Sequence, residues 1–74
     1  MNWKIDNVLN CTIDDVYKRL VEDLKINENQ ATILKEHFIN GNVLVELNED
    51  DIKEMNLKVG TRKQLAKQIK NISN

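Results

Sequence analysis

The amino-acid sequence predicts an all-α protein, a compact five-helix bundle with two very short helices and a long C-terminal helix. Three observations lead to this prediction. Apolar residues recur at three- and four-residue steps through most of the chain, which is the spacing of a single helix face. Residue types that cap helix N-termini precede several of these stretches. The 74 residues include no proline, and no stretch has the alternating pattern of a strand.

The length and composition indicate one small domain that folds without stabilising disulfide bonds or metal sites. A chain of this size buries only about 60% of its unfolded surface. Cys11 has no second cysteine to pair with, so we expect a small buried apolar residue. The chain has no Cys/His cluster, and we expect neither a metal nor a cofactor. The apolar runs are too short for a membrane span or a signal sequence, so we expect an intracellular, cytoplasmic setting.

The N-terminal residues 1–10 carry apolar side chains without a clear helical period. Because Trp3 is the only tryptophan, we expect this extension to pack on the core rather than to be disordered. The first helix is then predicted to begin after Thr12, with the Thr12 hydroxyl as the N-cap and Asp15 completing a variant capping box. The helix is predicted to end near Lys25, and its apolar stripe comprises Ile13, Val16, Tyr17, Leu20, Val21 and Leu24.

The second helix is predicted to begin after Asn27 or Asn29, with Gln30 in the box position if Asn27 is the cap. Its stripe continues through Ala31, Leu34 and Phe38. His37 has no second potential ligand nearby, so we interpret it as a histidine at the rim of the core rather than as a catalytic residue. A turn follows at Asn40-Gly41, a dipeptide suited to a positive φ.

Two short helices and a long one complete the predicted bundle. The first short helix contains Val43, Leu44 and Leu47, and the second begins at Asn48 with Asp51 at its third position. Asn56 is predicted to end the second in the left-handed conformation.

The last helix is predicted to follow a turn at Val59-Gly60. It begins at Gly60 or Thr61, where Thr61 and Gln64 repeat the capping pattern. Across the whole bundle we expect ten buried side chains: Leu20, Leu24, Leu34, Phe38, Leu44, Leu47, Ile52, Leu57, Leu65 and Ile69.

Charge is strongly segregated along the chain although the net charge is only −1. Residues 1–57 hold all twelve acidic residues and six basic ones, a net of −6. Residues 58–74 hold five basic residues and no acidic one, a net of +5. A molecule polarised in this way can dock head to tail with a copy of itself, or offer its basic end to an anionic partner.

The ordered pattern from Gly41 to Leu65 resembles the sterile alpha motif (SAM) domain. The residues that carry it are Gly41, Leu44, Val45, Leu47, Asn48, Glu49, Asp50, Asp51, Ile52, Lys53, Met55, Leu57, Gly60, Arg62 and Leu65. The opening helix also resembles that of the family, so we assign residues 11–72 to the domain and 73–74 to a tail.

Four residues depart from the pattern of this family. Cys11 and Arg19 stand where the family often has tryptophan, Asn56 where it has glycine and Thr61 where it has histidine. We therefore expect Trp3 to pack against the first and last helices and to replace part of the missing volume.

The resemblance implies a non-enzymatic module of a signalling or scaffold protein, which binds another SAM domain of the same or a different protein. It implies two surfaces, which meet in a head-to-tail oligomer. The acidic surface comprises Asn42, Val43, Glu46, Glu49, Asp50, Asp51 and Glu54. The basic surface comprises Lys58, Gly60, Thr61, Arg62, Lys63 and Lys67. The alternative is an RNA hairpin bound at the basic helix start, although no aromatic residue lies nearby in the sequence to stack on a base. We expect no membrane surface and no small-molecule substrate.

Overall fold

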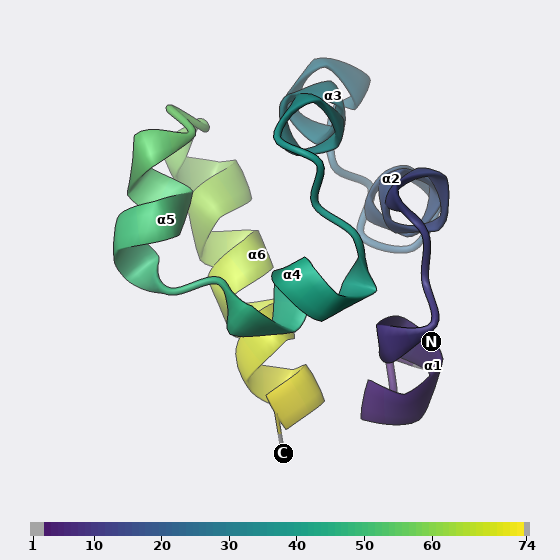
Figure 1. The fold of residues 1–74 in the computed structure, drawn as a ribbon. Coiled ribbons are helices and arrows are strands. Elements are labelled where there is room, and N and C mark those ends of the chain that lie inside the picture. Colours follow the sequence, from purple (N-terminus) through teal and green to yellow (C-terminus); the bar gives the residue numbers. More distant parts are fainter. Residues whose placement is uncertain (1–2, 74) are drawn as a thin grey trace.

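The computed structural model describes residues 3–73, and every regular element in that part of the chain is an α-helix. The helices are α1 (Ile5–Leu9), α2 (Ile13–Glu22), α3 (Glu28–Glu36), α4 (Gly41–Glu46), α5 (Glu49–Glu54) and α6 (Val59–Ser73) (Figure 1). The predicted all-α class is confirmed, with α1 as a helix that the sequence pattern did not predict. Residue 74 of the expected tail lies outside the described residues.

The helices enclose one apolar core. Eight of the ten side chains expected to be buried are buried: Leu20, Leu24, Leu34, Leu44, Ile52, Leu57, Leu65 and Ile69. Leu47 is half-buried and packs against the edge of this core. Phe38 was predicted wrongly, because 74% of its surface is exposed.

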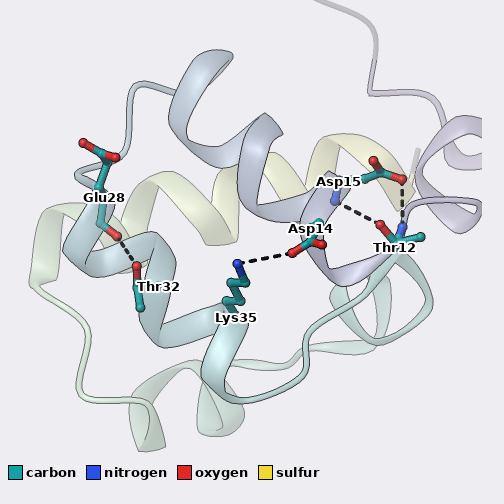
Figure 2. Close-up of polar contacts among 6 residues, drawn as sticks. All are labelled: Thr12, Asp14, Asp15, Glu28, Thr32 and Lys35. Carbon is teal, nitrogen blue, oxygen red and sulfur yellow. Dashed lines mark hydrogen bonds and ion pairs between the residues drawn. The ribbon is translucent and has the colours of Figure 1, made fainter.

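Helix α2 begins with the predicted capping box (Figure 2). The Asp15 amide donates to Oγ1 of Thr12 at 3.1 Å, and the Thr12 amide donates to Oδ2 of Asp15 at 3.1 Å. The hydrogen bond from the Thr12 backbone, followed by that from its hydroxyl, holds the pKa of Asp15 below its usual value of 3.8. These bonds satisfy donors that the first turn of a helix leaves without partners.

Helices α2 and α3 pack side by side through buried apolar residues and are also linked by exposed side chains. The Lys35 ammonium lies 3.2 Å from Oδ1 of Asp14 (Figure 2), and 5.2 Å from the centre of the Tyr17 ring. Both charged side chains are largely exposed, so the ion pair adds about 1 kcal/mol or less to stability. The apolar contacts therefore dominate this interface.

The N-terminal residues join the core through α1 and α4, which pack together. Val8 of α1 is almost completely buried, and the Gly41 amide donates to the Cys11 carbonyl oxygen at 3.0 Å. A Cβ atom on Gly41 would overlap the Val8 carbonyl oxygen. The predicted positive φ at Gly41 is wrong, since no glycine has one among residues 3–73; a glycine is needed here because the two backbones are so close.

Trp3 lies in the core cluster with only 7% of its surface exposed. The Arg19 guanidinium of α2 is 5.6 Å from the centre of its ring, within the range of a cation–π interaction. Cys11 is also buried, and its Sγ donates to the Asn7 carbonyl oxygen at 3.4 Å. The buried thiol and the buried indole thus both belong to the N-terminal part of the core.

The start of α3 differs in detail from the predicted cap. Asn27 is the N-cap and accepts a hydrogen bond from the Asn29 amide at 2.8 Å. Gln30 does not complete a box there, because its Oε1 accepts from the Lys58 amide at 2.8 Å instead. This bond ties the loop before α6 to α3.

The start of α6 is also earlier than predicted. The helix begins at Val59, and the Arg62 amide donates to the Lys58 carbonyl oxygen at 2.9 Å. The predicted turn at Val59-Gly60 is therefore wrong, as is the predicted cap at Thr61, which lies buried inside the first turn. The Gln64 side chain donates to the Leu24 carbonyl oxygen and so joins α6 to the chain after α2.

Candidate functional site

The acidic residues of the candidate site lie mainly on α5, whose first turn is organised by a capping box. The Asp51 amide donates to Oδ1 of Asn48 at 2.9 Å, and the Asn48 amide donates to Oδ2 of Asp51 at 3.3 Å. Glu49 and Asp50 share this exposed turn, where the helix dipole favours negative charge. Asp51 therefore has a structural role, whereas no such bond to Asp50 or Glu54 is present among residues 3–73.

A hollow between α4, α5 and the segment that follows α3 brings part of the predicted acidic surface together. We call it the acidic hollow, and its lining residues are His37, Ile39, Val43, Leu47, Asp51, Glu54 and Met55. Its floor includes the buried side chains of Ile39 and Met55. The carboxylates of Asp51 and Glu54 and the partly exposed Val43 lie beside them in the lining, with His37 and Leu47. The hollow thus offers apolar surface beside negative charge.

A second hollow lies between α5 and α6, which pack side by side (Figure 1). We call it the α5–α6 hollow, and its lining residues are Glu49, Ile52, Lys53, Val59, Arg62, Lys63 and Ala66. It places Glu49 of the predicted acidic surface together with Arg62 and Lys63 of the predicted basic surface. The acidic residues are therefore divided between two hollows, which lie on different sides of α5.

The basic residues at the start of α6 differ in their exposure. Lys58, Lys63 and Lys67 are exposed, whereas Arg62 is half-buried. The Arg62 Nε atom is buried and makes no hydrogen bond to any described residue. Gly60 is exposed, and a Cβ there would meet no atom within 4 Å. Of this set, the three lysines are the side chains best placed to meet a partner's carboxylates.

The remaining predicted residues line neither of these hollows. Asn42, Glu46 and Asp50 are exposed. Asn42 and Glu46 lie on α4 and Asp50 lies on α5, close in the sequence to residues that line the acidic hollow. They add polar and negatively charged surface to these two helices. Thr61 is buried, so its side chain is not available to a partner.

Two exposed apolar residues were not predicted as site residues. Val59 opens α6 with 57% of its surface exposed, and Phe38 follows α3 with 74% exposed. The helical spacing of Phe38 from Leu34 suggested burial, and no feature of the sequence marked the end of α3 before it. Val59 lies between lysines in the sequence, and this charged context is the signal that could have found it.

The comparison with protein families agrees with this architecture. The SAM-like domain family matches residues 3–71, so the chain belongs to this family. Members of the family are typically non-catalytic protein-interaction modules. Searches of curated proteins and of solved structures returned no match.

The structure can also be compared with the expectations about metals and membrane spans. Among residues 3–73, no group of three or more His, Cys, Asp or Glu side chains is arranged to hold a metal ion. No helix in the same range is both long enough and apolar enough to cross a membrane.

Proposed function

We propose that this domain associates with SAM domains, in the first place with copies of itself, through the acidic hollow of one molecule and the basic start of α6 of the next. One observation carries the proposal: the two sides of α5 belong to different hollows. Asp51 and Glu54 line the acidic hollow, whereas Lys63 lines the α5–α6 hollow beside Val59. The α5–α6 hollow is net positive, because Lys53, Arg62 and Lys63 outnumber Glu49 in its lining, and surfaces of opposite charge on different sides of one helix support a contact that repeats from copy to copy.

The association is expected to be of modest affinity and sensitive to salt. Each exposed ion pair contributes about 1 kcal/mol or less, and salt screens it. Sedimentation velocity across a range of protein concentrations tests this directly. We expect larger species as the concentration rises, and fewer of them at high salt. A wild-type protein that stays monomeric at every concentration would contradict self-association.

Charge-reversal variants locate the two surfaces. Glu54→Lys alters the acidic hollow and Lys63→Glu alters the start of α6, and both side chains are exposed. We expect each variant to be monomeric where the wild type associates. Glu22→Lys and Lys18→Glu, both at exposed positions on α2, are the matched controls and should associate as the wild type does.

RNA binding is tested in the same experiment with an added RNA hairpin. The large aromatic side chain that is exposed among residues 3–73 is Phe38, whose neighbours His37 and Ile39 line the acidic hollow rather than the start of α6. A base stacked on Phe38 would therefore be at the edge of a hollow lined by Asp51 and Glu54, whose charge disfavours a phosphate. We therefore expect no change in sedimentation on adding RNA.

A further inference from the structure

Phe38 combines two unfavourable features that the fold alone does not explain. Its backbone is in the left-handed region with φ of 57°, where residues other than glycine and asparagine are disfavoured. Its ring is also largely exposed to solvent. The Phe38 amide donates to the Lys35 carbonyl oxygen at 3.0 Å, and the Ile39 amide donates to the Leu34 carbonyl oxygen at 3.2 Å. These are the bonds of a Schellman motif, in which the position of Phe38 is usually glycine.

The surroundings of Phe38 connect it to the acidic hollow. His37 and Ile39, the residues on either side of it, both line this hollow. Val43, with 36% of its surface exposed, lines it as well. Because both of its neighbours line the hollow, the Phe38 backbone lies at the edge of a hollow that also holds Val43 and the carboxylates of Asp51 and Glu54. Apolar residues with a charged rim are typical of an interface that buries its centre.

The start of α6 carries the complementary arrangement. Val59 is 57% exposed; Lys58 directly precedes it in the sequence, and Lys63 follows it by four residues in α6. Apolar surface beside positive charge on α6 therefore corresponds to apolar surface beside negative charge at the acidic hollow. This complementarity favours a second copy of this chain over an anionic membrane or nucleic acid, which the carboxylates would repel.

We propose that Phe38 is the apolar anchor of self-association and that it packs against Val59 of a second copy. The inference rests on the proposed function and adds to it an apolar centre between the two charged surfaces. Since Phe38 and Val59 belong to different surfaces, the contact is heterologous. A linear oligomer built from it has an unpaired Phe38 at one end and an unpaired Val59 at the other.

The test is Phe38→Gly, compared by sedimentation equilibrium with the wild type. Glycine suits the left-handed backbone, so the variant should fold with an unchanged or higher melting temperature. We expect self-association to weaken about tenfold or more, because the loss of a buried aromatic anchor corresponds to at least that change. Lys25→Gly is the matched control: Lys25 is exposed and has φ of 58°, but it lies far along the chain from the acidic hollow. It should associate as the wild type does.

A double-variant cycle tests the pairing itself. Val59→Ser should weaken association to a similar degree, and Leu9→Ser, at a partly exposed apolar position on α1, should not. If Phe38 packs against Val59 of the next copy, the combined variant should weaken self-association by a factor much smaller than the product of the two single factors.

The possible outcomes separate this inference from the proposed function. If Glu54→Lys and Lys63→Glu abolish association but Phe38→Gly associates as the wild type, the charged surfaces stand and the anchor is wrong. Strictly multiplicative effects in the cycle would overturn the pairing with Val59. If neither the charge variants nor Phe38→Gly change association, both proposals are wrong. A monomeric wild type also overturns both.

Discussion

Gly41 lies so close to the carbonyl oxygen of Val8 that no side chain fits between them. This contact joins α4 to α1, the helix that the sequence pattern did not predict. The Gly41 amide also donates to the Cys11 carbonyl oxygen. The glycine therefore fixes the N-terminal residues against the rest of the bundle, and it does so through close packing rather than through an unusual backbone angle.

We predict that Gly41→Ala lowers the free energy of unfolding by about 3 kcal/mol, since the added methyl group must separate two packed backbones. In a domain of this size the melting temperature should fall by about 12 °C or more. Gly60→Ala is the matched control, because its Cβ would meet open space inside a helix. It should raise stability by about 0.5–1 kcal/mol. Thermal unfolding followed by circular dichroism measures both, and equal effects would contradict the close approach at Gly41.

Trp3 is predicted to be essential to the N-terminal part of the core. Trp3→Ala should cost about 3–5 kcal/mol, as expected for a buried tryptophan. Trp3→Phe should cost less, because the indole Nε1 is buried without a hydrogen-bond partner among the described residues and none is lost. Chemical denaturation of the two variants gives these values. An emission spectrum typical of a fully hydrated indole in the wild type would contradict the burial of Trp3.

The capping box of α2 should make part of the stability dependent on pH. The pKa of Asp15 is lowered in the folded state by its bonds to Thr12, so its contribution is present above the unfolded pKa and is lost as the pH falls through the folded value. Asp15→Asn should therefore reduce the loss of stability below about pH 4. Denaturant unfolding between pH 2 and 7 tests this. Wild-type and variant curves of the same steepness at acid pH would disprove it.

The backbone at Phe38 provides a prediction about stability that is independent of association. Phe38→Gly should raise the free energy of unfolding by about 0.5–1 kcal/mol, because a residue with a Cβ pays about 1–2 kcal/mol for the left-handed conformation and glycine recovers part of it. Lys25→Gly should give a similar gain. Both are measured at a protein concentration at which the wild type is monomeric. A loss of stability in Phe38→Gly would show that the ring contributes to the core after all.

The sequence predicted the features that depend on local spacing. The capping residues Thr12 and Asn48 and the left-handed Asn56 lie where their side chains and backbone preferences indicate. Their partners are three residues away or fewer, so the linear pattern contains all the information. The apolar stripes likewise predicted most of the buried side chains.

Features that depend on contacts between distant segments were not predictable. Helix α1 spans only Ile5–Leu9, too short for a periodic pattern, and no side chain caps it. Gln30 and Gln64 were assigned to local caps, but they bond to Lys58 and Leu24, at separations of 28 and 40 residues. Phe38 continues the apolar stripe of α3, yet the helix ends before it.

The division of the predicted acidic residues between two hollows also depends on contacts between distant segments. The acidic residues of α5 are neighbours in sequence, and their order suggests one surface. Helix packing places Asp51 and Glu54 beside α4 and the segment that follows α3, but places Glu49 beside α6. Which side of so short a helix meets which neighbour is decided by the tertiary structure.

The most direct test of head-to-tail association is sedimentation velocity of an equal mixture of Glu54→Lys and Lys63→Glu. Each variant alone should be monomeric, but each keeps one intact surface. The mixture should therefore form a one-to-one dimer at concentrations where the wild type forms longer species. A mixture that stays monomeric, or single variants that associate as the wild type does, would contradict an association built from the acidic hollow and the start of α6.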